Sequence, residues 1–327
     1  MAPAGNRGRV ISAVLAALVI DASLLPVAHA AAQDYPARPI TLIVPYPPGG
    51  GVDNMGRLIA QKLSLALGQQ VIVENRPGAG AVIGTRAAAK AAPDGYTLVM
   101  MTTGVSLPAN TGYDVYKDFA PIGLIASTPI VLMSGAAFPA KSLADVIALA
   151  KKEPGKLTVG TPPPPTLNYF AGELLKTMTG VDFTLVTYKG TGPLTNDLVG
   201  GHVSLGFNTI APALGNLQAG TLRAIAVAAP KRATALPDVP TAAEAGLPGF
   251  EAVLYYGLAA PAGTPRAIVE RLNKGLRAIV TSDETAKRII AEGGDPVASS
   301  PEEYAANIAR EEAKWTALIK TLGLVIN

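Results

Sequence analysis

Short apolar runs alternate with helical segments along most of the chain, and this alternation limits the fold more than any other feature. The runs ITLIVP, QQVIVEN, YTLVMMT, KLTVGT and FTLVTY have the length and residue types of buried strands. A helical or mixed segment, such as NMGRLIAQKLSLAL or LNYFAGELLKTMTG, follows each run. Repeated strand–helix–strand units predict mainly parallel sheets that are flanked by helices. The sequence therefore predicts an α/β fold.

The number of predicted strands favours two smaller sheets over one very wide sheet, and hence two α/β lobes. The stretches PIVLMS and EAVLYYGL are interpreted as strands that cross from one lobe to the other. We expect residues 33–132 together with 255–327 to form the first lobe, and residues 133–254 to form the second. In open α/β sheets a ligand binds beyond the carboxyl ends of the strands.

The amino terminus has the features of an export signal, predicted here as residues 1–30. Arg7 and Arg9 precede an apolar stretch, and Ala28-His29-Ala30 forms a small-x-small cleavage site. Asp21 interrupts the apolar stretch, which makes it a poor membrane span. Removing 30 of the 327 residues leaves 297, so the mature chain is expected to begin near Ala31. The signal predicts an exported, soluble protein.

Composition and motifs exclude several classes of function. The net charge is +3 with no run of Lys or Arg longer than two, which argues against nucleic-acid binding. The chain has no cysteine, and cleavage would leave His202 as the only histidine, so neither a metal site nor a Ser-His-Asp triad is predicted. Gly78, Gly80 and Gly84 resemble a dinucleotide fingerprint, but the ribose-binding acidic residue is missing. We expect no cofactor.

The stretch PYPPGGGVD, from Pro45 to Asp53, joins a predicted strand to a predicted helix. Its glycines are explained either by a tight turn with positive φ or by an anion site, in which backbone N–H groups at the helix start face a ligand. The stretch alone leaves both readings open. Four other loops at predicted strand ends, TTGVS, GTPPPPT, TYKGTG and FNTIAP, supply neutral hydrogen-bonding groups. Together with PYPPGGGVD they carry few charges, namely Lys189 and Asp53. Such loops suit binding and release.

Five long motifs resemble one family. They are YPARPITLIVPYPPGGGVD, VIVENRPGAGAVIGTRAAAKAAPDGYTL, YKGTGPLTNDLVGGHV, LRAIAVAAPKRATALPDVPTAAEAGLPGFE and GLAAPAGTPRAIVERLN. In this order they are similar to the substrate-binding proteins of tripartite tricarboxylate transporters, the Bug proteins. The resemblance implies a type II-like, two-lobed periplasmic binding protein that closes its cleft on a small carboxylate without catalysis.

The resemblance also implies site residues. In the family the loop that matches PYPPGGG approaches the ligand carboxylate through backbone groups and water, which points to Tyr46, Pro48, Gly49, Gly50 and Asp53. The full set of candidate ligand-binding residues is Tyr46, Pro48, Gly49, Gly50, Asp53, Thr103, Thr161, Thr166, Asn168, Tyr188, Lys189, Asn208 and Tyr256.

Three positions depart from the family pattern. Prolines 162–165 replace small residues in the second-lobe loop, and Asn168 stands near a usual histidine, so contacts there do not transfer directly. Asn208 replaces a common aspartate, which favours a ligand without an amino group. Tyr256, beside Tyr255, stands where a tryptophan is common.

The sequence as a whole predicts a monomeric periplasmic protein that captures a small organic carboxylate, aliphatic or aromatic, mono- or dicarboxylic. Its expected partners are the membrane components of a tripartite transporter. The alternatives are a carboxylate sensor that signals to a membrane receptor and, less favoured, an exported hydrolase, for which no nucleophile elbow or base is found.

Overall fold

A computed structural model describes residues 35–103 and 111–323 of the chain. The chain divides into two compact units, Met1–Ala37 and Arg38–Asn327. Every helix and strand of the described residues belongs to the second unit. The predicted export signal lies outside the described residues. None of the described helices combines the length and the hydrophobicity that crossing a bilayer requires.

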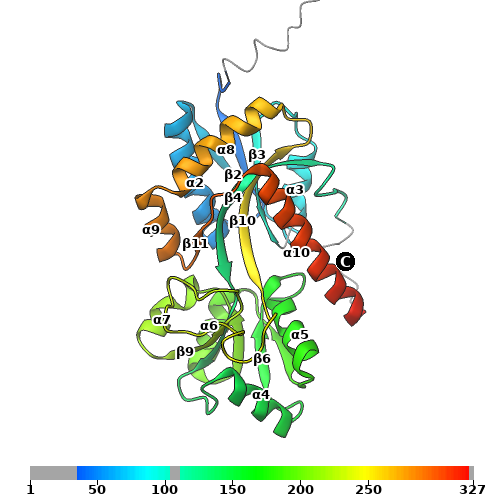
Figure 1. Cartoon of the computed structure of the whole chain (residues 1–327), viewed down its shortest axis with the longest axis vertical. Helices are drawn as coiled ribbons and strands as arrows, with labels where there is room; N and C mark the ends of the chain where they lie inside the picture. The colour runs from blue at the N-terminus through cyan, green and yellow to red at the C-terminus, as the bar shows by residue number, and fades with distance from the viewer. Residues whose placement is uncertain (1–34, 104–110, 324–327) are drawn as a thin grey trace, which may run out of the picture. The chain divides into compact units, whose positions relative to one another are not determined.

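The first sheet of this unit has six strands, in the order β11-β4-β10-β3-β1-β2. The strands are β1 (Ile40–Val44), β2 (Val71–Asn75), β3 (Thr97–Thr102), β4 (Phe119–Pro129), β10 (Val253–Pro261) and β11 (Asp295–Pro296). The helices that accompany them are α2 (Gly51–Leu67), α3 (Val82–Ala89), α8 (Arg266–Val280), α9 (Asp283–Ala291) and α10 (Pro301–Leu322). Figure 1 shows these elements around one sheet.

The second sheet has five strands, in the order β7-β6-β8-β5-β9. The strands are β5 (Val131–Gly135), β6 (Thr158–Thr161), β7 (Thr184–Thr187), β8 (Leu205–Asn208) and β9 (Leu222–Val227). The helices around it are α4 (Leu143–Lys152), α5 (Leu167–Thr179), α6 (Thr191–Gly200), the short 3-10 helix η3 (Ala211–Ala213) and α7 (Leu214–Gln218). The two sheets and their helices give the predicted two-lobe α/β fold.

Both sheets are mixed, so the expectation of mainly parallel sheets was wrong. Parallel pairs join β1 to β2 and β3, and β6 to β7 and β8. β4 and β10 pair antiparallel with each other, and β5 pairs antiparallel with β8 and β9. The reason is that β4 leads directly into β5, while the chain returns from the second sheet through β10, so these connecting strands run in opposite directions.

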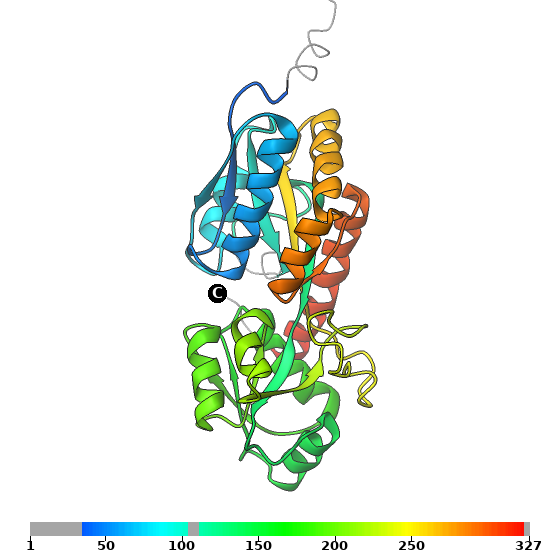
Figure 2. The same ribbon diagram turned by 90° about the vertical axis from the view of Figure 1, so that its left-hand side faces the viewer.

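Alternating side chains bury both faces of each sheet. In the first sheet Ile43, Val99 and Met101 pack with α3 and α10, whereas a Cβ added to Gly56 of α2 would meet Val44 and Met100 on the opposite face. The second sheet packs one face against α4 and α5, and the other against α6 and α7. Figure 2 shows helices on both sides of the sheets. Burial of both faces explains why most strands are continuous apolar runs.

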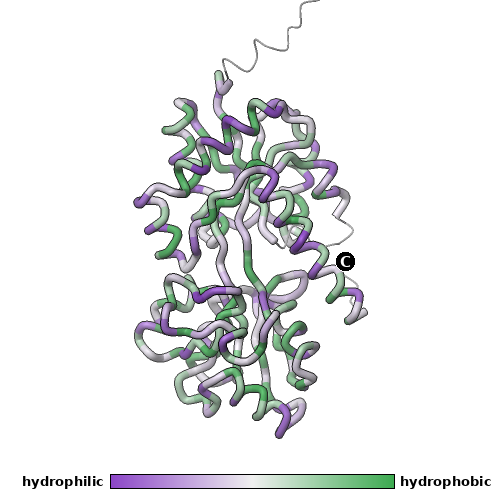
Figure 3. The backbone as a smooth tube through the Cα atoms, in the orientation of Figure 1, coloured by the Kyte–Doolittle hydropathy of each residue, from purple (hydrophilic) through white to green (hydrophobic). Residues whose placement is uncertain are grey.

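Helix α10 connects the two cores. Its first half places Tyr304 and Ile308 in the core of the first sheet, and its second half places Trp315, Leu318 and Ile319 in the core of the second. Figure 3 shows hydrophilic and hydrophobic residues alternating along this helix. The helix begins with a capping box between Ser300 and Glu303.

The lobe boundaries expected from the sequence, 132/133 and 254/255, stay predictions, and they lie close to the points where the chain passes between the two sheets. The change of sheet falls at Ile130, between β4 and β5, and the return falls before Val253 at the start of β10. Pro129, which breaks the extended stretch in the sequence, is the last residue of β4.

Candidate functional site

The loops that follow the parallel strands lie at two sheet edges. Because β1, β2 and β3 are parallel, their carboxyl ends meet at one edge, and the same holds for β6, β7 and β8 in the second sheet. The loop from β1 into α2 and the loops that follow β6, β7 and β8 contribute to two cavities that residues of both sheets line. This is the position that open α/β sheets use for ligands.

The larger cavity has a volume of about 330 Å³ and is lined mostly by small and neutral polar residues. Its lining residues are Gly49, Gly50, Gly51, Asn54, Met55, Thr128, Tyr256 and Glu292 from the first sheet's side, and Thr191, Thr209, Ala211 and Pro212 from the second. The volume falls at the lower end of the range for small-molecule pockets.

The smaller cavity has a volume of about 180 Å³ and is more apolar. Its lining residues are Tyr46, Val52, Gly80, Thr102 and Leu254, together with Pro165, Thr166, Leu167 and Asn168 of the loop and helix that follow β6. Gly51 borders the larger cavity and Val52 the smaller, so the first turn of α2 lies between them.

Three helices begin beside these cavities, and none of the three has a side-chain cap. The N-caps of α2 and α6 are Gly50 and Gly190, and the hydroxyl of Thr166, the N-cap of α5, donates to the carbonyl oxygen of Pro162 instead. By contrast, α4 and α10, which begin at neither cavity, have complete capping boxes. The missing cap is not confined to these three helices, because α3, α7, α8 and α9 also lack one, and α3 begins just after Gly80 of the smaller cavity.

The first amide groups of a helix have no acceptor within that helix, and the helix dipole gives this end a partial positive charge. In the described residues no lysine or arginine lines either cavity. An anion in these cavities would therefore be held by main-chain N–H groups and neutral hydroxyl groups, as in other helix-start anion sites.

Two tyrosines border the cavities in their neutral form. The hydroxyl group of Tyr46 lies 2.7 Å from the Oγ1 atom of Thr102, and burial raises the pKa of Tyr46 despite that bond. Burial also raises the pKa of Tyr256 to about 12, against the effect of its hydrogen bond with Thr128. Both phenols stay protonated at neutral pH and are able to donate a hydrogen bond.

Asp53 holds the loop before α2 in place. Its Oδ2 atom accepts hydrogen bonds from the Gly49 N–H and the Arg57 Nε, both at 2.9 Å, and its Oδ1 atom accepts from Asn75 Nδ2 at 2.8 Å. The same Asn75 nitrogen donates to the Tyr46 carbonyl oxygen. Asp53 is buried. Its carboxylate is engaged by the loop, so we assign it a positioning role in place of direct ligand contact.

The protonation of Asp53 should make the loop's contribution to stability depend on pH. Burial opposes ionisation of Asp53, but the hydrogen bonds from Arg57, Gly49 and Asn75 outweigh it and lower the pKa of the carboxyl group below its usual value. A folded-state pKa below the unfolded value stabilises the fold above the unfolded pKa, and this contribution is lost as the pH falls through the folded pKa.

We expect Asp53→Asn to lower the free energy of unfolding by about 1–2 kcal/mol at pH 7, because it removes charge-assisted hydrogen bonds. The difference between variant and wild type should begin to shrink below about pH 4, the usual pKa of aspartate in an unfolded chain, and should shrink further as the pH falls through the lower pKa of the folded state. Urea unfolding at several pH values measures it. A difference that is the same at pH 7 and pH 3 would show that the ionised carboxylate is not what stabilises the loop.

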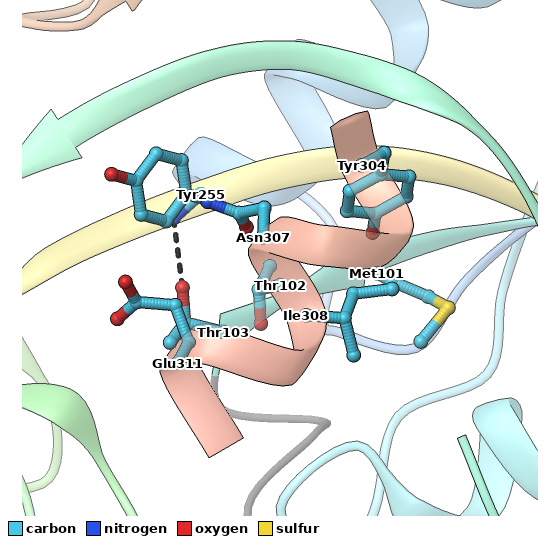
Figure 4. Close-up of a pocket in the computed structure, with 8 residues that line it drawn as sticks. All are labelled: Met101, Thr102, Thr103, Tyr255, Tyr304, Asn307, Ile308 and Glu311. Carbon is cyan, nitrogen blue, oxygen red and sulfur yellow. Dashed lines mark hydrogen bonds between the residues drawn. The ribbon is translucent and has the colours of Figure 1, made fainter. Parts of the chain in front are cut away.

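Thr103, expected at the site, instead belongs to the interior beside α10. Its hydroxyl accepts a hydrogen bond from the Tyr255 N–H at 2.9 Å and donates to the Val253 carbonyl oxygen at 3.2 Å. Figure 4 shows the hydrogen bond between Tyr255 and Thr103 beside a pocket that Glu311 and Asn307 of α10 also line. The pocket has a volume of about 10 Å³, which is room for a single water molecule. Thr103 therefore joins β3 to β10.

Other predicted residues lie near the cavities without lining them. Asn208 is fully buried, and its amide donates to Thr195 Oγ1 and accepts from the Thr209 N–H. Thr161 is also fully buried, and its hydroxyl has no hydrogen-bond partner among the described residues. Tyr188 donates to Asp197 at 2.9 Å. Lys189 and Pro48 are exposed and border neither cavity.

Six predicted residues do line the two cavities: Tyr46, Gly49, Gly50, Thr166, Asn168 and Tyr256. Asn168 also donates to the carbonyl oxygen of Phe207, which leaves its side chain partly engaged. Sequence analysis missed Asn75, Thr128, Thr191 and Glu292. Asn75 and Thr191 lie in the quoted motifs VIVENRPG and YKGTG, whereas Thr128, in β4, and Glu292, directly after α9, have no distinguishing sequence pattern.

The described residues do not form a recognisable catalytic or metal centre. His202 is exposed and lies outside both cavities, as expected for a solvated histidine. Within residues 35–103 and 111–323, no group of three histidine, aspartate or glutamate side chains is arranged to hold a metal ion. The cavities offer hydrogen-bonding groups and helix amino ends to a ligand.

Comparison with known proteins identifies relatives along nearly the whole chain. A family model described as "Tripartite tricarboxylate transporter family receptor" matches residues 55–324. Protein BugT of Bordetella pertussis is 36% identical over 302 residues, which cover 90% of this chain and 93% of BugT.

Solved structures give the same result. The structure titled "R. palustris Rpa4515 with adipate" is 37% identical with a TM-score of 0.80, and the match covers 89% of this chain and 99% of that one. MatC (Rpa3494) from Rhodopseudomonas palustris, solved with bound malate, is 33% identical with a TM-score of 0.75, covering 87% and 100% of the two chains.

Proposed function

The chain belongs to the tripartite tricarboxylate transporter receptor family, and from this membership we propose that it captures a small organic carboxylate and passes it to the membrane components of a transporter. Family members are periplasmic binding proteins. The adipate and malate complexes of its relatives support a carboxylate as the ligand. The family and its solved members are receptors, which supports binding without turnover.

One observation carries the proposal. Helices α2, α5 and α6 have their amino ends at the cavities between the two sheets, and no side chain caps their first amide groups. Among the described residues, no lysine or arginine lines those cavities. Main-chain N–H groups at helix starts recognise carboxylates while leaving the ligand free to dissociate. The residues we propose for contact are Tyr46, Gly49, Gly50, Thr166, Asn168 and Tyr256, with Thr128, Thr191 and Thr209 added from the structure.

A thermal-shift screen of the purified protein without residues 1–30 tests this function. The screen should contain mono- and dicarboxylates, aliphatic and aromatic, with the corresponding amides as uncharged controls. A ligand present at a hundred times its Kd should stabilise the folded protein by about 2.7 kcal/mol, which raises the melting temperature by several degrees. Stabilisation by amides as strong as by their parent acids would contradict carboxylate recognition.

Export and transport need separate measurements. We propose that residues 1–30 are removed on export, so the mass of the periplasmic protein should correspond to a chain that starts near Ala31. Deleting the protein should abolish uptake of the labelled carboxylate by whole cells. Normal uptake combined with a lost transcriptional response to the carboxylate would favour the sensor role over transport.

A further inference from the structure

Glu292 is the one charged side chain among the described residues that line the larger cavity. It follows α9 directly and forms its C-cap. The turn after it is fixed against the second sheet's side, because a Cβ added to Gly293 would lie 2.6 Å from the Cβ of Ile210. The backbone at Glu292 is therefore held in place, and its solvent-exposed side chain lines the same cavity as Thr128 and Tyr256.

The surroundings of Glu292 do not neutralise its charge. The carboxyl end of a helix carries a partial negative charge, so a carboxylate at the C-cap of α9 is at the unfavourable end of the dipole. Within residues 35–103 and 111–323, no lysine or arginine forms an ion pair with Glu292. Its charge also reaches Tyr256, where it adds to the effect of burial in raising the pKa of the phenol.

The larger cavity is therefore polarised. The starts of α2 and α6, at Gly50–Gly51 and Thr191, provide its electropositive wall, and Glu292 with the end of α9 provides an electronegative wall. A second carboxylate on a ligand is favoured at the first wall and repelled at the second. A hydroxyl or ammonium group, which donates hydrogen bonds, is favoured at the second wall.

We propose that Glu292 selects the ligand of this cavity, which is a carboxylate that carries a hydrogen-bond donor at its other end, and that it disfavours plain dicarboxylates. This specificity rests on the carboxylate-binding function proposed above. It replaces the sequence-based preference for a ligand without an amino group, since the Asn208 amide that supported that preference is fully buried and already bonded to Thr195 and Thr209.

Matched ligand series test the role of Glu292. One series is butyrate, 4-hydroxybutyrate, 4-aminobutyrate and succinate, and a second is hexanoate, 6-hydroxyhexanoate, 6-aminohexanoate and adipate, so that only the terminal group changes within each. Calorimetric titrations would compare wild type, Glu292→Gln and Asp283→Asn. Asp283 is the matched control, because it is an exposed acidic residue at the other end of α9 and borders neither cavity.

In at least one series we expect the wild-type protein to bind a donor-bearing acid at least tenfold more tightly than the dicarboxylate. Glu292→Gln should weaken the binding of that acid at least tenfold and strengthen the binding of the dicarboxylate, and Asp283→Asn should change neither. Preference for the hydroxy acid over the amino acid, or the reverse, identifies the donor.

Three results would overturn the proposal. One is a wild-type preference for the dicarboxylate in both series, and another is an equal response of the two variants. In either case carboxylate binding itself would stand. Failure of every carboxylate, in these series and in the thermal-shift screen, to bind any of the three proteins would overturn the proposed function together with this specificity.

Discussion

Gly50→Val should abolish carboxylate binding, with at least a hundredfold loss of affinity, while leaving the protein folded. Gly50 is the N-cap of α2 and lines the larger cavity. Its φ of −82° and ψ of 167° are extended backbone that valine adopts readily, and a Cβ there meets only the Pro47 carbonyl oxygen, at 3.8 Å. The valine methyl groups would therefore occupy ligand space without straining the loop.

Calorimetry of ligand binding, together with melting of the unliganded protein, measures both effects of Gly50→Val. Gly215→Val is the control, because a Cβ at Gly215 meets nothing within 4 Å and Gly215 borders neither cavity. Gly49→Ala is a second comparison: Gly49 has a φ of +82°, so alanine should lower stability through strain. Normal ligand affinity in a folded Gly50→Val protein would show that the PYPPGGG loop serves only as a turn and does not bind the ligand.

Trp315→Ala should lower the free energy of unfolding by about 3–5 kcal/mol, the range for deleting a fully buried tryptophan. Trp315 is fully buried in the core of the second sheet, and its ring centroid lies 6.1 Å from that of Phe170. Its indole nitrogen donates to Glu311 at 3.2 Å. Because the first half of α10 packs on the first sheet, the substitution also weakens a connection between the two cores.

Denaturant unfolding of two further variants separates packing from hydrogen bonding at Trp315. Trp315→Phe keeps an aromatic ring but loses the indole N–H, so it should cost clearly less than Trp315→Ala. Lys320→Ala, on an exposed position of the same helix, should change stability by less than about 0.5 kcal/mol. Equal losses for Trp315→Phe and Trp315→Ala would contradict a role based mainly on ring packing.

Much of the fold could be predicted from the sequence because strands and helices differ in hydrophobic period. The runs ITLIVP and YTLVMMT contain β1 and β3 nearly to the residue. Strand direction could not be predicted in the same way. A run such as PIGLIASTPIVLMS contains no information on the direction of its neighbours, and β11 has only two residues.

The site was predicted only in part, since position at a strand end does not determine where a side chain points. Gly49 and Gly50 line the larger cavity through their backbone, so the motif was sufficient to place them there. Three other predicted residues also lie at or after strand ends, but the side chain of each is hydrogen-bonded within its own lobe; they are Asp53, Thr103 and Asn208. Glu292 lines the larger cavity beside the turn after α9, and this turn lies against Ile210, which is distant in the sequence.

A crystal structure of the protein with the carboxylate that stabilises it most in the thermal-shift screen tests the central claim most directly. We expect a carboxylate oxygen within about 3 Å of main-chain N–H groups in the first turn of α2 or α6, directly or through one water molecule, and no lysine or arginine side chain on that oxygen. A ligand bound outside both cavities, or one whose carboxylate is held by a cationic side chain, would contradict recognition by helix amino ends.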